Sequence, residues 1–600
     1  MNMAILDIQD LQIIFTNDEG QATIAVDKIN VSLEKGEILG IVGESGSGKS
    51  VTSLGIMGLL PSSGKISDGK IYFQDNANNL PIDIVSLAKE AKRHYRGGKI
   101  AMIFQEPMSS LNPVYNIGFQ ITEAIRLHQN ISELEAKGKA INLLQEVKLL
   151  PNDEELIAEF LQQNTIKNPS DKDIQFYLKQ RKQSILKRFP HEMSGGQLQR
   201  VMIAIAISCQ PSILIADEPT TALDVTVQAT ILELLKELCR SRQMSLIFIT
   251  HDLAVVANIA DSLAVMYQGK IVEYGKTREI LFNPTQAYTK GLLACRPRLD
   301  ETRSYLPTVA DFMADNSVTT PPSFTVNPRE IKLNHPLLTV EKLKVGFPKK
   351  GSLPWQKEYF WAVNEVSFQV FSGETLGLVG ESGCGKSTLA RTILRLIPTD
   401  EGKIEFLGQD LTKLSPRSKH LRQLRREMQI VFQNPYNSLN PRISIGNTII
   451  EPMIIHGMGG NKEKRQERVR YLLDRVGLNP NWFNRYPHEL SGGQRQRVCI
   501  ARALALNPQL IICDESVSAL DVSIQAQVLN LLKELQAEFG LTYIFISHDL
   551  SVVKFMSDRI MVMNKGEIEE MSTATQIIDN PQREYTRKLI ASIPKFPTAA

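Results

Sequence analysis

Cysteine is scarce in this 600-residue sequence and follows no recognisable pattern. No two cysteines form a C-x-x-C pair or a spacing typical of a zinc site. Isolated cysteines of this kind predict reduced thiols and a cytosolic protein without structural metal or disulfides. The six are Cys209, Cys239, Cys295, Cys384, Cys499 and Cys513.

Long hydrophobic runs are also missing. One of the longest, Val201–Cys209, falls far short of the ~20 residues that a membrane-spanning helix requires. The N-terminal segment contains Asp7 and Asp10 and has no basic stretch followed by an apolar one, so no secretory signal is expected. Any association with a membrane should therefore be peripheral.

The chain has almost no net charge, because 68 Lys and Arg residues are balanced by 65 Asp and Glu residues. This balance gives no electrostatic reason to expect nucleic-acid binding. With 42% hydrophobic and 22% charged residues, the composition excludes a disordered polyelectrolyte and a fibre. The length predicts globular α/β material in more than one domain.

The same motifs occur twice, in the same order. From S-G-G-Q to the histidine, each element lies 297 residues from its counterpart, which indicates a geometrically constrained stretch. The repeated segments are G-E-S-G-[SC]-G-K-S (43–50 and 380–387), F-Q-x-P-x-x-S-L-N-P (104–113 and 432–441), S-G-G-Q (194–197 and 491–494), D-E followed by A-L-D (217–224 and 514–521), and H-D-L (251–253 and 548–550).

The repeats divide the chain into a first domain over residues 1–299, a linker over 300–336 with T-T-P-P-S near its middle, and a second domain over 337–600. The first copy carries a net insertion of 31 residues before S-G-G-Q, around residues 151–184. We interpret this polar insertion as a solvated helical excursion, with a dedicated partner site as the alternative.

Each glycine-rich loop follows a strand-like run (37–42 and 374–379) and precedes a helical pattern (52–60 and 389–396). This context predicts a phosphate-binding loop, whose backbone N–H groups converge on phosphate at the start of a helix. Lys49 and Lys386 should bridge the β- and γ-phosphates, and Ser50 and Ser387 should supply hydroxyls to Mg²⁺. The expected nucleotide-binding residues of the loops are Gly43, Glu44, Ser45, Gly46, Ser47, Gly48, Lys49, Ser50, Val51, Gly380, Glu381, Ser382, Gly383, Cys384, Gly385, Lys386, Ser387 and Thr388.

Two adjacent carboxylates end an apolar strand in each copy. Asp217 and Asp514 should reach the edge of a parallel sheet beside the phosphate loop and hold the Mg²⁺ shell. Glu218 and Glu515 point differently because neighbouring strand residues alternate, which makes them candidates for the general base that polarises water.

The histidine that follows the next strand, His251 or His548, is a candidate γ-phosphate contact, although a lone histidine there is more often structural. Gln105 and Gln433 can donate and accept, and we expect them to touch Mg²⁺ or water and to act as sensors rather than bases.

Each S-G-G-Q opens a helix, over residues 198–208 and 495–506, and so offers a second phosphate-binding terminus. One nucleotide cannot readily use both sites of one domain, so we expect each S-G-G-Q to cover the nucleotide held by the other copy. The residues concerned are Ser194, Gly195, Gly196, Gln197, Ser491, Gly492, Gly493 and Gln494.

The complete set of motifs resembles the nucleotide-binding domains of ATP-binding-cassette proteins, twice over. The resemblance implies α/β folding as two tandem P-loop NTPase domains, each with a RecA-like core, an antiparallel β subdomain and a helical subdomain. It implies ATP and Mg²⁺ as cofactors and adds Asp224 and Asp521 to the nucleotide-binding residues. It also implies an adenine-stacking aromatic: Phe15 in the first copy, and in the second Phe347, with Tyr359, Phe360 and Trp361 as competitors.

The S-L-N-P turn, L-D-V-[TS]-[VI]-Q-A and the repeated N-P-x-x-x-Y-T near Asn283 and Asn580 resemble the ATPase subunits of bacterial oligopeptide and dipeptide importers. Fused versions include the group linked to microcin C uptake. The resemblance implies an ATP-hydrolysing translocase subunit on the cytoplasmic face of the inner membrane. Its partners would be two integral-membrane permeases and, through them, a periplasmic or extracellular substrate-binding protein.

Alternatives remain open from the sequence. A soluble tandem cassette acting on ribosomes is disfavoured because the Pro-containing linker lacks a long charged helix, and an exporter would use the same ATPase chemistry. Some relatives carry a cysteine cluster after the first cassette, where this chain has only Cys295, so we expect no iron–sulfur cluster. We also expect no nucleic-acid partner.

Overall fold

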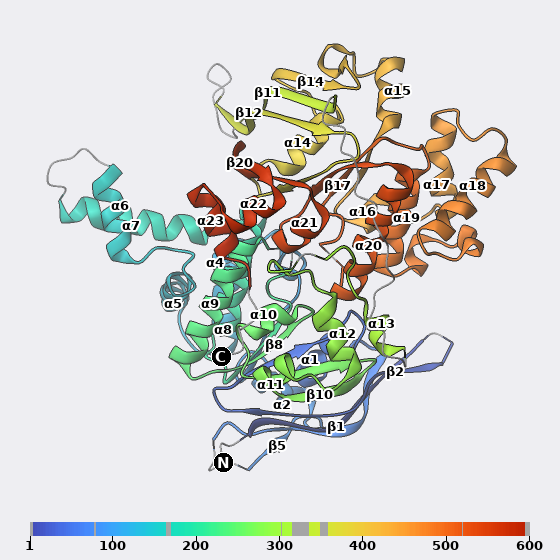
Figure 1. The fold of residues 1–600 in the computed structure, drawn as a ribbon. Helices are drawn as coiled ribbons and strands as arrows, with labels where there is room; N and C mark the ends of the chain where they lie inside the picture. Colours follow the sequence, from blue (N-terminus) through green and yellow to red (C-terminus); the bar gives the residue numbers. More distant parts are fainter. Residues whose placement is uncertain are drawn as a thin grey trace. The chain divides into compact units, whose positions relative to one another are not determined.

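The computed structural model describes most of the chain, and the description below is confined to residues 4–17, 19–76, 80–163, 170–221, 223–301, 303–314, 335–348, 358–518 and 520–594. The chain forms two compact units. The first comprises residues 1–223, 227–290 and 594–600, and the second comprises 224–226 and 291–593. Figure 1 labels the elements of both, and each unit is described by itself.

The centre of the first unit is a six-stranded sheet in the order β10-β9-β3-β8-β7-β6. The pairs from β9 to β6 are parallel, and β10 is an antiparallel edge strand. Every residue of β3 and β7 is buried, as expected for strands covered on both faces. The strands are β3 (Ile38–Val42), β6 (Ile100–Ile103), β7 (Ile213–Asp217), β8 (Ser245–Thr250), β9 (Ser262–Tyr267) and β10 (Lys270–Lys276).

A four-stranded antiparallel sheet, in the order β2-β1-β4-β5, adjoins this core. Alternate residues of β1, including Leu11 and Ile13, are fully buried and join the apolar cluster that contains Leu39 and Ile41 of β3. The helix after the phosphate loop contacts both β1 and β7. These elements are β1 (Ala4–Thr16), β2 (Ala22–Glu34), β4 (Gly64–Phe73), β5 (Ile82–Asp83) and α1 (Lys49–Met57).

A helical region lies between β6 and β7 in the chain. Its helices are α3 (Pro107–Ser110), α4 (Ile117–His128), α5 (Glu133–Glu146), α6 (Asp153–Gln163), α7 (Asp171–Leu186) and α8 (Gly195–Ile207), with the short turn η1 (Pro190–Glu192) before the last. Outside this region the unit has α2 (Lys89–Tyr95), α9 (Val225–Arg242), α10 (Leu253–Ala257) and α11 (Thr277–Phe282).

The insertion is helical, as predicted, and consists of α6 and α7 side by side (Figure 1). The rings of Phe160 and Tyr177 pack with centroids 4.9 Å apart, and Lys182 pairs with Asp153 at 2.7 Å. Ser170 begins α7 with a capping box. Phe176 is 70% exposed, so much of this pair faces solvent.

The second unit repeats the architecture. Its strands follow the orders β16-β17-β18-β13-β19-β20 and β12-β11-β14-β15, which match the first unit strand for strand. The strands are β11 (Pro336–Pro348), β12 (Tyr359–Phe371), β13 (Thr375–Val379), β14 (Glu401–Phe406), β15 (Gln409–Asp410), β16 (Met428–Val431), β17 (Leu510–Asp514), β18 (Thr542–Ile546), β19 (Arg559–Asn564) and β20 (Glu567–Thr573). The helices are α14 (Lys386–Ile393), α15 (Lys419–Glu427), α16 (Pro435–Ser438), α17 (Ile445–Ile455), α18 (Lys462–Arg475), α19 (Gly492–Leu504), α20 (Val522–Phe539), α21 (Leu550–Met556), α22 (Ala574–Asp579) and α23 (Glu584–Ala591), with short turns η2 (Leu411–Lys413), η3 (Pro480–Asn484) and η4 (Pro487–Glu489).

The first repeat ends with α12 (Ala287–Cys295), and the segment after it contains α13 (Val309–Met313). Within the second unit, Leu306 is fully buried and bonds through both backbone groups to the side chain of Asn530 on α20, at 3.0 and 2.8 Å. Part of the stretch expected to be a linker therefore packs on folded structure. The T-T-P-P-S segment lies outside the described residues.

Candidate nucleotide site

The phosphate loops connect β3 to α1 and β13 to α14. The side chain of Lys49 is buried, and its Nζ donates to the carbonyl oxygens of Gly43 and Glu44 at 2.8 Å each. Lys386 does the same to Gly380 and Glu381, at 2.7 and 2.8 Å. Both helices begin at this lysine, a few residues earlier than the sequence pattern suggested, because the preceding glycine adopts a left-handed conformation that opens the helix.

The first glycine of each loop is required by a close approach of backbone. A Cβ atom on Gly43 would lie 2.2 Å from the carbonyl oxygen of Met266 in β9. The same distance separates a Cβ on Gly380 from the carbonyl of Met563 in β19. Each loop is therefore packed onto the neighbouring strand, with Ser45 and Gly46 left exposed at its tip.

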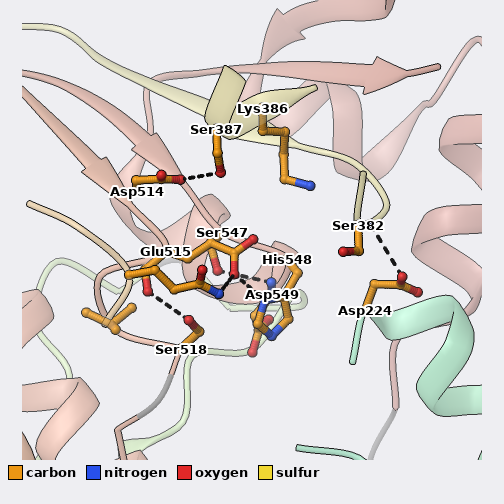
Figure 2. A network of polar contacts seen from close by, with 12 residues as sticks. Asp224, Ser382, Lys386, Ser387, Asp514, Glu515, Ser518, Ser547, His548 and Asp549 are labelled. Carbon is orange, nitrogen blue, oxygen red and sulfur yellow. Dashed lines mark hydrogen bonds and ion pairs between the residues drawn. The ribbon is translucent and has the colours of Figure 1, made fainter. Parts of the chain in front are cut away.

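A serine hydroxyl and a buried carboxylate meet beside each loop. Ser50 Oγ donates to Asp217 at the end of β7, 3.0 Å away, and Ser387 donates to Asp514 at 2.9 Å (Figure 2). Burial raises the pKa of Asp217 to about 6, although the bond from Ser50 opposes it, and burial also raises the pKa of Asp514. A serine hydroxyl oxygen beside a buried carboxylate is the kind of oxygen ligand set that a hard divalent ion such as Mg²⁺ prefers.

Glu218 contacts two other predicted site residues, Gln105 and His251, and has a left-handed backbone, with φ 47°. It accepts from Gln105 Nε2 at 2.9 Å and from Thr221 Oγ1 at 3.0 Å, and its Oε1 lies 3.2 Å from Nδ1 of His251. Burial raises the pKa of Glu218, but the bond and charge of His251 outweigh it and bring the pKa to about 2. The carboxylate is thus ionised and orients hydrogen-bond donors.

Glu515 has the same kinds of partner: it accepts from Gln433 Nε2 at 2.8 Å. Its carboxylate lies 3.6 Å from Nδ1 of His548 (Figure 2). Burial opposes ionisation of both groups, yet their pairing lowers the pKa of Glu515 and raises the pKa of His548. The structure therefore brings the predicted glutamine, glutamate and histidine together within each unit.

The two S-G-G-Q segments begin α8 and α19, three residues earlier than predicted. Ser194 and Gln197 form a capping box, in which the Ser194 hydroxyl accepts from the amide of Gln197. Ser491 and Gln494 repeat it. The serines are exposed, so their hydroxyls are available to a ligand.

The remaining predicted contacts lie in different settings. Asp224, counted with the second unit, accepts from the amide of Ser382 at 3.3 Å (Figure 2), and Asp521 directly precedes α20 without a capping bond from its side chain. Phe15 is half-buried, with its ring over Gly64 of β4. Phe347 is 43% exposed at the end of β11, where it pairs with Phe360.

Two residues that sequence reasoning did not place in the site touch the phosphate loops. The hydroxyl of Tyr288 accepts from the amide of Glu44 at 3.1 Å, and the hydroxyl of Tyr585 accepts from the amide of Glu381 at 3.1 Å. The sequence contained a pattern that could have pointed to them, because both tyrosines belong to the repeated N-P-x-x-x-Y-T.

Comparison with known proteins agrees with this geometry. The family model described as ABC transporter matches residues 26–221 and 363–518, which include both loops and both Asp–Glu pairs. The chain belongs to the ABC transporter family. A second model, the oligopeptide/dipeptide transporter C-terminal region, matches residues 272–320 and 569–600 of this ABC protein.

Similar relatives include proteins named glutathione import ATP-binding protein GsiA. Those of Shigella boydii serotype 4 and Escherichia coli K12 are each 46% identical over 597 residues, which covers 98% of this chain and 89% of the relative. The GsiA of Salmonella choleraesuis is 46% identical over 593 residues. This ABC protein is therefore an ATP-binding and ATP-hydrolysing subunit that energises a peptide importer, and such a subunit works with membrane permeases and a substrate-binding protein.

Proposed function

We propose that each cassette of this subunit binds Mg-ATP and that hydrolysis energises two integral-membrane permease subunits. The chain would contact these permeases as a peripheral protein at the cytoplasmic face of the bacterial inner membrane. The cassettes would extend over residues 1–299 and 337–600, joined by 300–336. The transported molecule would be a short peptide or a peptide-like compound such as glutathione. The names of the relatives support the substrate class.

The roles of the site residues follow from their positions. Lys49 and Lys386 would bind phosphate, since each buried ammonium donates to carbonyl oxygens of its own phosphate loop. The Ser50–Asp217 and Ser387–Asp514 pairs, with Gln105 and Gln433, would hold Mg²⁺, which would neutralise phosphate charge when bound. Glu218 and Glu515 would orient the attacking water and accept its proton, with His251 and His548 fixing each carboxylate.

The covering role of the S-G-G-Q segments is part of this proposal. Their exposed serines at helix N-termini suit contact with phosphate oxygens. Asp224 and Asp521 would lie near the nucleotide, and Phe15 and Phe347 would stack on adenine. The proposal also holds that the chain carries no iron–sulfur cluster and binds no nucleic acid.

An exposed apolar surface beside the Gln105 loop is the observation that best supports permease docking. Met108, Val114, Tyr115 and Phe119 are 60%, 72%, 47% and 44% exposed, and the rings of Tyr115 and Phe119 stack with centroids 4.6 Å apart. Apolar groups gathered on a surface mark interaction sites in soluble proteins. Their place after Gln105 connects such a site to Glu218 through the hydrogen bond between those two side chains.

No helix in the described part of the chain is long and apolar enough to cross a bilayer. Retention at the membrane would then depend on permease contact. The test is to tag the chain in its own cells, isolate membranes and identify the proteins that co-purify.

Val114→Asp should release the chain from membranes, because it places a charge in the apolar surface. Leu134→Asp is the matched control, since Leu134 is 83% exposed on α5, outside this surface. Recovery of wild-type chain with ribosomes instead of permeases, or equal retention of both variants, would contradict the proposal.

A further inference from the structure

The repeated N-P-x-x-x-Y-T motif lies near the end of each cassette, within the two segments that the oligopeptide/dipeptide transporter model matches. Its two copies are separated by the same 297 residues as the catalytic motifs, although the ATPase family model does not include them. A spacing conserved this far beyond the histidine indicates that the motif is held in a fixed relation to the nucleotide site.

The structure gives that relation in the first unit. The Tyr288 hydroxyl accepts from the amide of Glu44, the second residue of the phosphate loop. Tyr288 is 2% exposed, and its ring packs against Tyr267 of β9 with centroids 4.3 Å apart. The tyrosine is therefore held by packing, and its hydroxyl is directed at the loop.

The start of the motif is anchored separately. Glu273 on β10 accepts from the amide and hydroxyl of Thr285 at 2.8 and 2.9 Å. It also accepts from the amide of Gln286 at 3.4 Å. This carboxylate therefore fixes the turn that precedes Tyr288 to the edge strand of the core sheet.

The second unit repeats the construction with different residues in the turn. Glu570 on β20 accepts from the amides of Gln582 and Arg583 at 2.9 and 3.1 Å, and Tyr585 accepts from the amide of Glu381 at 3.1 Å. Glu570 is 297 residues from Glu273, and Tyr585 is 297 residues from Tyr288. The carboxylate, the turn and the tyrosine are thus a repeated unit, whereas the side chains of the turn are free to vary.

We propose that Tyr288 and Tyr585 are positioning residues for ATP: each hydroxyl fixes the beginning of its phosphate loop in the conformation that binds phosphate. The bonded amide belongs to the same residue whose carbonyl accepts from the phosphate-loop lysine, because Glu44 O bonds Lys49 Nζ and Glu381 O bonds Lys386 Nζ. The peptide segment at this residue is therefore held from both sides. Loss of the tyrosine bond leaves this peptide segment held on the lysine side and no longer on the tyrosine side, so phosphate must complete the ordering of the loop on binding.

This role is independent of which molecule the importer carries. It also assigns a function to the region near the end of each cassette, namely support of the nucleotide site on its own unit.

The test is steady-state ATPase kinetics of the full chain carrying Tyr288→Phe and Tyr585→Phe, which remove only the hydroxyls. Loss of a neutral hydrogen bond of about 0.5–1.5 kcal/mol corresponds to a weakening of about 2- to 12-fold. We expect KM for ATP to rise within that range while kcat stays within about twofold. Hydrogen exchange at residues 43–46 and 380–383 should become faster without nucleotide.

Tyr274→Phe is the matched control, because its hydroxyl donates to the carbonyl of Ser32 in β2 rather than to the phosphate loop. A purely structural role for the motif tyrosines would lower the melting temperature and leave KM and loop exchange unchanged, and that result would overturn the proposal. A fall in kcat with unchanged KM would also overturn it. Glu273→Gln tests the anchor, since weakening the turn should raise KM in the same direction as Tyr288→Phe.

Discussion

Nδ1 of His251 lies 3.2 Å from Oε1 of Glu218, and the counterpart pair of His548 and Glu515 is separated by 3.6 Å. In the first unit the histidine and a glutamine contact different oxygens of the carboxylate, and in the second unit both contact Oε2 of Glu515. A fixed, ionised carboxylate beside a phosphate loop is suited to orienting water for attack on phosphorus.

Glu218→Gln combined with Glu515→Gln should slow ATP hydrolysis by roughly 10²–10⁴, because the amide keeps the shape but cannot accept the proton. Nucleotide binding should survive, since the phosphate loops are unchanged. Phosphate release and ATP binding measured on the same preparation check both parts. Glu237→Gln, at an exposed ion pair with Lys148, serves as the control, and near wild-type turnover in the double variant would exclude the role of the glutamates.

Stability of the second unit should depend on the charge of His548. Its pairing with Glu515 raises the pKa of His548 despite burial. The stability that this pairing contributes is therefore full below the pKa of the unfolded histidine, near 6.5, and is lost as pH rises through the folded pKa. The difference in melting temperature between wild type and His548→Gln, without nucleotide, should shrink between pH 6 and pH 9.

His456 gives a control of opposite sign. Burial, together with nearby Arg422 and Arg426, lowers the pKa of His456, so its protonation in the unfolded state destabilises the native chain at low pH. Wild type should therefore lose stability relative to His456→Gln as pH falls towards 6. A pH-independent difference for His548→Gln would contradict the ion pair.

Binding of Mg-ATP should release protons from Asp217 near pH 6. The pKa of this buried carboxyl is about 6, and a coordinating carboxylate must be ionised, so Asp217 should release about half a proton at pH 6 and almost none at pH 8. Calorimetry of the Glu218→Gln, Glu515→Gln chain in buffers of different ionisation enthalpy measures this release. Adding Asp217→Asn should reduce it at pH 6, and an unchanged release would show that Asp217 does not titrate on binding.

Asn530→Ala should destabilise the second unit by about 1–3 kcal/mol, because both backbone groups of buried Leu306 lose their partner. The corresponding residue of the first repeat is exposed Glu233, and Glu233→Ala should change stability by no more than about 0.5 kcal/mol. Denaturant unfolding of the full chain compares the two. Equal effects would mean that the segment around Leu306 contributes nothing to the folded unit.

Repetition made much of the fold predictable. The strand, loop and helix around Lys49 follow from glycine spacing and apolar runs. As expected, β7 ends at Asp217 and His251 directly follows β8. Helix starts were less accurate: α8 begins at Gly195 because the capping box of Ser194 and Gln197 outweighs the low helix propensity of two glycines.

Other features depend on contacts between distant segments. No local pattern shows that Gln105 bonds Glu218 or that Leu306 reaches Asn530, because each pair meets only in the folded unit. The positive φ of Glu218 is likewise imposed by its surroundings, since glutamate has no local preference for it. Tyr288 was visible as a repeated motif, but its direction towards the loop required the packing of β9 and β10.

Uptake into vesicles reconstituted with the co-purified permeases tests the central claim, that hydrolysis at the two Asp–Glu sites energises peptide import. With ATP on the cassette side and the substrate-binding protein on the other, wild-type chain should accumulate labelled glutathione or a labelled short peptide. The Glu218→Gln, Glu515→Gln chain should bind ATP and accumulate none. Uptake by that double variant at the wild-type rate would contradict the account.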